Sequence, residues 1–178
     1  MNAGEGDDGS GPGDQDSVAL VDHDPSWTAA FERERSALLL HLGASALSVE
    51  HVGSTAVPGL RAKPVLDIMV GVRELALPAF QAPLEELGYV HVPIGCRERL
   101  FFRKGMPRTH HLHLVLEGGE EQRSHLAFRD WLRGHPEDAR EYQDLKERLA
   151  ERFAHDRDSY TEGKAGFIRG ILVKALDE

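Results

Sequence analysis

The sequence predicts an α+β (or α/β) domain in which one mixed β-sheet is flanked by helices and followed by a helical C-terminal segment. Three observations predict this fold. A helical apolar pattern occupies residues 26–42, short apolar segments typical of strands dominate residues 46–116, and residues from 124 onward have helical periodicity. With 178 residues and 40% hydrophobic content, the chain has the size and composition of one globular domain.

The acidic charge is concentrated at the N-terminus. The net charge is −9, and residues 1–17 contribute Glu5, Asp7, Asp8, Asp14 and Asp16 without a basic residue. We expect this Gly-rich stretch to be a disordered tail before a domain at 18–178. The domain lacks the excess of Lys and Arg that nonspecific nucleic-acid binding requires. No apolar run approaches the ~20 residues of a membrane span, and no secretion signal is apparent, so a cytoplasmic location is expected.

The first half of the domain alternates between helix and strand signals. After a short apolar segment at 18–21, Ser26 is the expected cap of a helix that stops at Gly43. Strands are predicted at 46–52, 64–72 and 89–92, with a helix at 77–87 before the last of them.

The second half begins with a hairpin and ends in helices. Residues 97–105 and 110–119 are expected to pair through a turn at 105–109, where Gly and Pro favour a reversal of the chain. Ser124 is the expected cap of a helix ending at Gly134. Pro136 suits the first position of the next helix, and a third helix should begin near Asp156.

One aspartate stands out within the strand predicted at 64–72. Because side chains alternate along a strand, Asp67 and Met69 should face one way, and Leu66, Ile68 and Val70 the other. An ionised carboxylate there needs a partner or a metal. Asp67 is therefore either a structural carboxylate paired with Arg61, Lys63 or a backbone amide, or a metal ligand.

The stretch HVGSTAVPGLRAKPVLDIMV, residues 51–70, carries a family resemblance. Its strand, Gly-Ser turn and Asp-containing strand resemble the polymerase-β-like nucleotidyltransferase superfamily. Together with FRDWLRGHPEDAREYQDLKERLA and DRDSYTEGKAGFI, it resembles the GrpB family across about 18–175. The resemblance implies that the Gly-Ser turn contacts a nucleotide triphosphate, that Asp67 binds Mg²⁺ or Mn²⁺ as a catalytic ligand, and that dephospho-CoA kinase is a candidate protein partner.

The sequence departs from the superfamily pattern at one important position. That pattern has a second carboxylate two residues after the first, where this chain has Met69. A two-metal mechanism needs ligands for ions about 3.5–4 Å apart, and one aspartate cannot supply them. The sequence therefore leaves open whether the protein is an enzyme or a noncatalytic module that binds a ligand or a partner.

Other candidate residues lie on the predicted hairpin and the last helix. Arg97, Arg99, Phe101 and Arg103 should share one face of the first strand, and His111 and His113 should share the exposed or cleft side of the second. If the strands of Asp67 and His111 are neighbours, these two residues and His113 could hold one transition metal, which gives a third hypothesis of a small metal-dependent enzyme. Lys164 lies on the same helical stripe as Tyr160 and Phe167.

The leading hypothesis is a nucleotidyltransferase-like protein that binds a nucleotide or related phosphorylated ligand. The residues expected to bind that ligand are Gly53, Ser54, Thr55, Lys63, Arg97, Arg103 and Lys164. The alternative for the arginines is a solvated strand edge, for the histidines ordinary hydrogen bonding, and for Lys164 a stem packed on the core with its ammonium in water.

Overall fold

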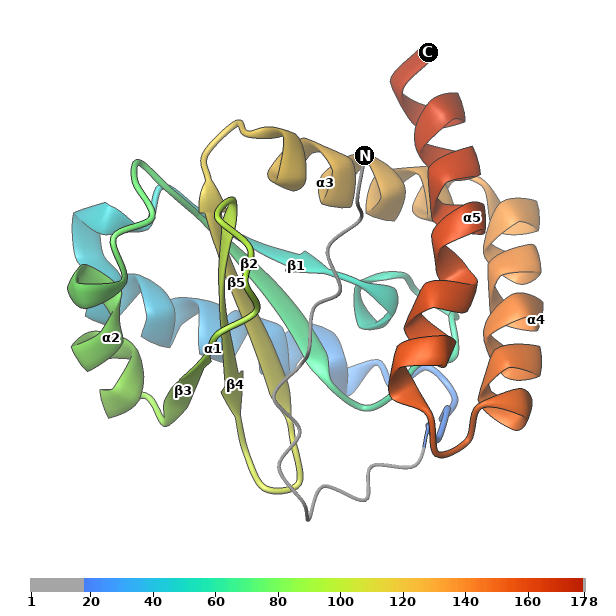
Figure 1. The fold of residues 1–178 in the computed structure, drawn as a ribbon, viewed down its shortest axis with the longest axis horizontal. Helices are drawn as coiled ribbons and strands as arrows, with labels where there is room; N and C mark the ends of the chain where they lie inside the picture. Colours follow the sequence, from blue (N-terminus) through green and yellow to red (C-terminus); the bar gives the residue numbers. More distant parts are fainter. Residues whose placement is uncertain (1–17, 178) are drawn as a thin grey trace.

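The computed structural model describes residues 18–177 and shows the predicted α+β fold (Figure 1). Its centre is a mixed five-stranded sheet in the order β1-β2-β5-β4-β3. The strands are β1 Ser48–Val52, β2 Leu66–Val72, β3 Tyr89–Val92, β4 Arg99–Lys104 and β5 His110–Leu116. Only β2 and β5 are parallel to each other among these neighbouring pairs, and their contact brings the Asp67 strand beside the His111 strand.

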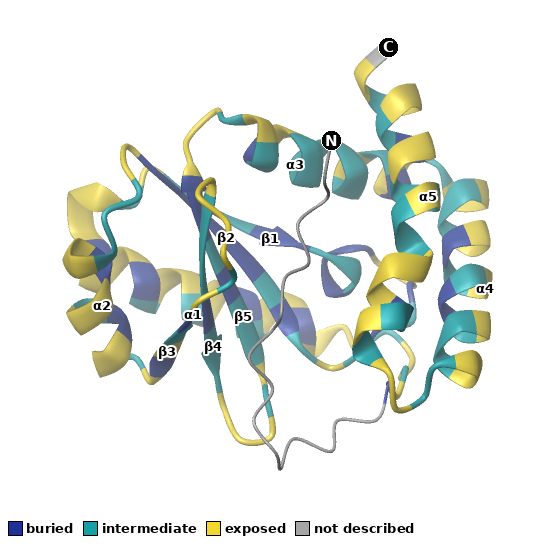
Figure 2. Ribbon diagram, viewed as in Figure 1, coloured by how far each residue is buried: buried dark blue, intermediate teal, exposed yellow. Residues whose placement is uncertain are grey.

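One face of the sheet carries the main hydrophobic core. Helices α1, Ser26–Leu42, and α2, Leu77–Glu86, cover this face. The buried residues are Trp27, Phe31 and Leu38 from α1, Phe80 and Leu84 from α2, and Leu66, Ile68, Val70, Phe102, Leu112 and Leu114 from the strands. Figure 2 shows the buried positions gathered on the strands and on the inward sides of the helices. The predicted alternation of β2 is thereby confirmed.

The C-terminal helices lie on the other side of the sheet. These are α3, Glu120–Gly134, α4, Pro136–Arg152, and α5, Arg157–Asp177. A second core of Val57, Leu60, Leu132 and Tyr142 joins them to the loop after β1. Figure 1 shows α4 and α5 standing beside the sheet rather than flat upon it. This placement leaves part of the sheet face available to form a site.

Two predicted helix caps were wrong. Helix α1 begins at Ser26 itself, and the carboxylate of Asp24 accepts the Ser26 N–H at 2.8 Å. Helix α3 begins at Glu120, so Ser124 lies inside it, although Gly134 ends it as predicted. In both helices an acidic residue other than the serine lies at the N-terminus: Asp24 accepts a backbone N–H at the start of α1, and Glu120 and Glu121 place negative charge in the first turn of α3.

The remaining elements agree with the sequence within a few residues. The hairpin of β4 and β5 is antiparallel as expected, and Pro136 is the first residue of α4. The segment at 18–21 forms only an isolated bridge between Val21 and Ala62. The expected acidic tail, 1–17, lies outside the described residues. Across residues 18–177, no helix combines the length and apolarity that a bilayer crossing demands.

Candidate functional site

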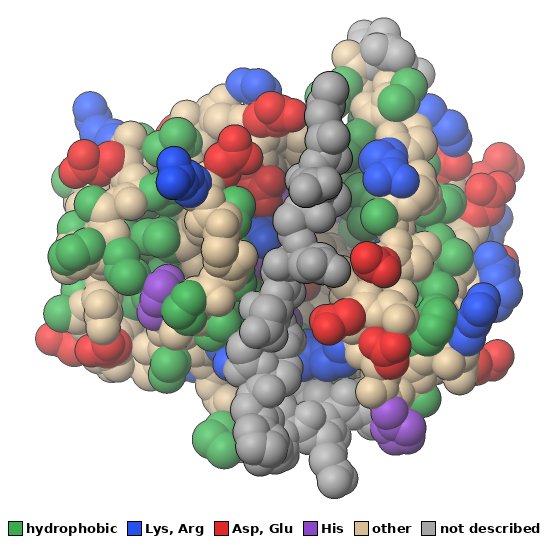
Figure 3. All heavy atoms as spheres, in the orientation of Figure 1, with side chains coloured by type: hydrophobic (Ala, Val, Ile, Leu, Met, Phe, Trp, Pro, Cys, Tyr) green, Lys and Arg blue, Asp and Glu red, His purple; other side chains and the backbone are tan. Residues whose placement is uncertain are grey.

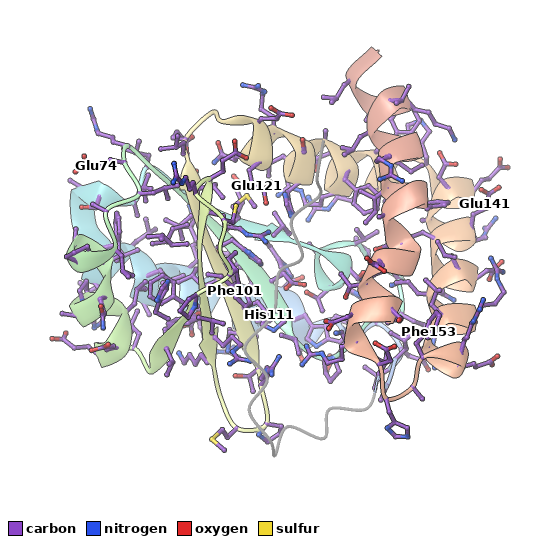
Figure 4. The ribbon with its side chains drawn as sticks, viewed as in Figure 1. Glu74, Phe101, His111, Glu121, Glu141 and Phe153 are labelled. Atoms are coloured by element: carbon purple, nitrogen blue, oxygen red, sulfur yellow. The ribbon has the colours of Figure 1, made fainter. Side chains whose placement is uncertain are left out.

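A cleft of about 640 Å³ lies between the open face of the sheet and α4 and α5. It brings together most of the predicted site residues. These are Gly53, Ser54, Thr55, Lys63, Asp67, His111, His113 and Lys164. Phe101 and His111 project from β4 and β5 toward this side of the sheet (Figure 4). Residues from four separate parts of the sequence therefore converge on one cavity.

The predicted arginine face is only partly realised. Arg97 precedes β4 and is exposed, so it does not share the strand face assigned to it. Arg103 lies opposite His111 in the β4–β5 register but does not line the cleft. Arg99 does line it and forms an ion pair with Glu121 at 2.9 Å. Because β4 starts at Arg99, later than predicted, Arg99 is the arginine of this strand that contributes positive charge to the cleft.

Asp67 forms a hydrogen bond with a histidine on the neighbouring strand. The parallel register places Asp67 beside His111, and His111 Nδ1 lies 3.0 Å from Asp67 Oδ1. Burial acts to raise the pKa of Asp67, but the hydrogen bond from His111 and the nearby charges of His111, His113 and Lys63 lower it to about 2. Arg61, a partner considered from sequence, instead pairs with Glu147 at 2.8 Å. Asp67 is thus a carboxylate at neutral pH.

Gly53 lies directly against Asp67. Its φ of 71° is in the left-handed region, and a Cβ there would lie 2.4 Å from Asp67 Oδ2. Only glycine allows the chain to leave β1, pass this carboxylate and enter the short 3-10 turn of Ser54–Ala56. The glycine of the Gly-Ser dipeptide is therefore required by the backbone conformation and the close approach to Asp67, and the serine that follows it lines the cleft.

Replacing Gly53 by alanine is expected to lower the free energy of unfolding by roughly 2–4 kcal/mol, through both the left-handed backbone and the collision with Asp67. Gly43→Ala is the matched control, because Gly43 has φ 52° but a Cβ added to it would meet nothing within 4 Å. That control should cost only about 1 kcal/mol. Urea unfolding measures both values, and equal losses would contradict the close contact with Asp67.

Two lysines on the helical side of the cleft are held in low-polarity surroundings. Lys146 is 1% exposed, and its Nζ donates to Ser54 Oγ at 3.1 Å and to the carbonyl of Arg61. Burial, together with the charges of Lys164 and Arg61, lowers the pKa of Lys146 to about 7, although Glu147 opposes the shift. Burial and the charges of Lys63 and Arg157 lower the pKa of Lys164 to about 8 against the attraction of Asp67.

Two imidazole nitrogens in the cleft are buried without a hydrogen-bond partner among residues 18–177. They are Nε2 of His111 and Nδ1 of His113. Burial and the charge of Arg99 keep the pKa of His113 well below its ordinary value, despite the opposing charge of Asp67. An unmade hydrogen bond at a buried polar atom costs about 1–3 kcal/mol. These atoms are therefore candidates for contact with a ligand.

The cleft does not provide the ligands of a two-metal centre. Within the described part of the chain, no group of three or more His, Cys, Asp or Glu side chains is arranged to hold a metal ion. Met69 occupies the position of the second carboxylate and is fully buried with Val52 and Val115. The residues present thus do not fit such a centre. The sequence-based expectation of Mg²⁺ or Mn²⁺ at Asp67 stays a prediction.

The cleft is basic although the protein is acidic. Its lining includes Lys63, Arg99, Arg108, Lys146, Arg157 and Lys164, against the two carboxylates Asp67 and Glu121. In Figure 3 acidic side chains are spread over the helices at both sides of the visible face. A second cavity of about 480 Å³, beside Pro58 and Leu132, contains none of the predicted site residues. The basic cleft is therefore the candidate site.

Sequence reasoning did not assign a binding role to Lys146, Arg108 or Arg157. A signal for Lys146 was present, since it lies one turn after Tyr142 on the inward stripe of α4, where both residues are buried. For Arg108 and Arg157 no comparable signal exists. Arg108 lies in the turn between β4 and β5, and Arg157 is the first residue of α5, so the position of each relative to the cleft depends on the packing of distant elements.

Comparisons with known proteins cover nearly the whole described chain. A family model described as GrpB protein matches residues 17–174. A UPF0157 protein of Pseudomonas aeruginosa is 44% identical, over 92% of this chain and 69% of that protein. The crystal structure of conserved protein GrpB from Enterococcus faecalis is similar with a TM-score of 0.82 and 37% identity, covering 89% of this chain and 98% of that one.

A more distant relative is considerably longer. A protein named dephospho-CoA kinase from Mycolicibacterium paratuberculosis is 28% identical over 188 residues. The match covers 90% of this chain but 46% of that protein. A region similar to this chain is therefore joined to further sequence in that relative.

Proposed function

We propose a function from the premise that this chain belongs to the GrpB family, whose family model and solved structure it matches along most of its length. The proposed function is that the basic cleft binds a nucleotide or a related small phosphorylated ligand. The observation that carries this proposal is Lys146. Its amine is buried in the cleft wall, and no carboxylate among residues 18–177 forms an ion pair with it. A buried ammonium is costly without a counter-charge. A phosphate group of the ligand supplies that charge.

The surroundings of Lys146 suit an anion with several charged oxygens. Ser54 places a hydroxyl 3.1 Å from the amine, and Lys164 lines the same cavity from α5. Hydrogen bonds between ionised partners are about twice as strong as neutral ones, so several such contacts give useful affinity. Binding also restores the charged forms of two lysines whose pKa values burial lowers.

The longer relative supports a second ligand candidate. Because a region similar to this chain occurs in a protein named dephospho-CoA kinase, dephospho-CoA or CoA is a candidate ligand, and dephospho-CoA kinase is a candidate protein partner. Both ligands carry phosphates, so the same lysines would bind them. The two candidates are separated by comparing affinities rather than by the geometry of the cleft.

Thermal shift assays with ATP, CTP, GTP, UTP, dephospho-CoA and CoA test this proposal, each with and without Mg²⁺ or Mn²⁺. A ligand at 100 times its Kd stabilises the folded state by about 2.7 kcal/mol, which raises the Tm by roughly 5–10 °C in a chain of this size. Dependence of the shift on the metal, and its loss in Asp67→Asn, would support a cation at Asp67. If none of the six compounds raises the Tm, the proposed function is contradicted.

Lys164→Gln is expected to weaken binding of whichever compound raises the Tm about tenfold or more, because it removes one charge-assisted contact from the cleft wall. Lys174→Gln is the matched control. Lys174 lies on the same helix, pairs with Asp138 at 2.9 Å and does not line the cleft. Calorimetric titration of both variants measures the difference, and equal affinities would remove Lys164 from the binding site.

A further inference from the structure

The pair of Asp67 and His111 has a geometry that its structural role does not require. One ring nitrogen of His111, Nδ1, contacts Asp67 at 3.0 Å. The opposite nitrogen, Nε2, is buried and has no hydrogen-bond partner within the described chain. His111 lines the same cleft as Ser54 and Lys164. The ring is therefore fixed at one end and unsatisfied at the other, inside the proposed ligand site.

The protonation of the pair follows from the carboxylate. Asp67 is ionised at neutral pH, because its pKa is about 2, so it can only accept a hydrogen bond. His111 must then donate from Nδ1–H. In the neutral imidazole this leaves a lone pair on Nε2. The arrangement specifies a tautomer whose free nitrogen accepts a proton.

The geometry of the pair separates the roles of the two residues. The Asp67 carboxylate, whose pKa is low, accepts the Nδ1–H hydrogen bond, and Nε2 of His111 is the atom that remains able to take up a proton from a ligand. The ring of Phe101 packs edge to face against the ring of His111, with the two ring centroids 5.3 Å apart, and both residues lie on the same side of the sheet (Figure 4). These contacts and the hydrogen bond to Asp67 hold the ring in a single orientation.

We propose that His111 is a general base, with Asp67 as its positioning residue, for transfer of a phosphoryl or nucleotidyl group to a hydroxyl-bearing acceptor. This inference rests on the proposed function for its phosphorylated donor. The acceptor hydroxyl gives its proton to His111 Nε2 while its oxygen forms a bond to phosphorus. The bond from phosphorus to the leaving oxygen breaks, and its electron pair departs with the nucleoside diphosphate when a phosphoryl group moves, or with pyrophosphate when a nucleotidyl group moves.

The surrounding charges suit each product of this step. The leaving group carries the additional negative charge beside Lys146 and Lys164, and the imidazolium formed at His111 lies beside the Asp67 carboxylate. The proton then passes from His111 to solvent or to the departed leaving group, which restores the neutral ring. Asp67 acts through His111 and does not itself take up the proton.

The tautomer of His111 can be measured without knowing the ligand. In long-range ¹H–¹⁵N correlation spectra of the full chain, we expect the neutral form of the ring to be protonated at Nδ1. A ring protonated at Nε2 would overturn the proposal, because it would have no lone pair to offer the acceptor. In Asp67→Asn the strict preference for Nδ1–H should be lost, since an amide can both donate and accept.

Turnover is measured with ATP, CTP, GTP and UTP, with Mg²⁺ and with glycerol or water as acceptor, by following the release of the nucleoside diphosphate and of pyrophosphate. His111→Gln should lower the rate of nucleoside diphosphate or pyrophosphate release at least 100-fold while keeping the nucleotide-dependent thermal shift. His110→Gln is the matched control: His110 is the adjacent residue on β5, but it contacts Tyr89 on the opposite side and does not line the cleft.

The outcomes separate this inference from the proposed function. A thermal shift without any release by the unaltered protein, or equal rates in His111→Gln and the unaltered protein, overturns the catalytic role and leaves ligand binding intact. If no compound produces a shift, the proposed function fails. Release that depends on His111, together with the Nδ1–H tautomer, supports the inference.

Discussion

Replacing Met69 by aspartate is expected to lower the free energy of unfolding by about 4 kcal/mol or more, rather than to supply a second catalytic carboxylate. Met69 is 0% exposed and packs with Val52, Val115 and Leu126 between the sheet and α3. The side chains of this cluster are apolar, so an ionised carboxylate introduced among them would lose water. Urea unfolding at neutral pH measures the loss.

Two further measurements distinguish the buried charge from a general sensitivity of the site. Met69→Leu conserves volume and polarity and should cost less than about 1.5 kcal/mol. Burial would raise the pKa of the introduced carboxyl in the folded protein, so the deficit of Met69→Asp should shrink as the pH falls and the carboxyl is neutralised. Near-normal stability of Met69→Asp at neutral pH would show that this position can accommodate a carboxylate after all.

Replacing Lys146 by methionine is expected to change how stability depends on pH. Burial lowers the pKa of Lys146 from 10.5 to about 7 in the folded protein. Between these two values the unfolded chain binds a proton that the folded chain does not, so this lysine makes stability rise with pH. The slope approaches about 1.4 kcal/mol per pH unit. Lys146→Met lacks this contribution. Between pH 7 and 9 the free energy of unfolding of the unaltered protein should therefore rise by about 2 kcal/mol relative to that of the variant.

Urea unfolding at several pH values between 6 and 9 measures this difference. Lys174→Met is the control, because it removes an exposed lysine of α5 that does not line the cleft. Its stability curve should run parallel to that of the unaltered protein. Lys146→Met should also lose the thermal shift given by the phosphorylated ligand. A curve for Lys146→Met that is parallel to the unaltered one would mean that the amine is solvated and charged in the folded state.

The sequence alone was sufficient for the faces of the central strands. Leu66, Ile68 and Val70 enter the main core as alternation predicted, and Asp67 faces the opposite side, because the two-residue period of a strand is a local property. The same holds for Lys164, which follows Tyr160 by one helical turn and lines the cleft. The GrpB resemblance was confirmed by the comparisons, whereas the wider nucleotidyltransferase assignment stays a prediction.

What the sequence determined by itself was therefore the type of each element, the side on which its polar residues lie and the family. Only the tertiary structure decided which of these residues meet. Asp67 is hydrogen-bonded to His111, 44 positions away, because β2 and β5 lie side by side in the parallel register, while Arg61 pairs with Glu147. Lys146 reaches Ser54 across 92 positions because α4 packs beside the turn after β1. Such contacts depend on how whole elements are packed, and no local pattern in the chain encodes that packing.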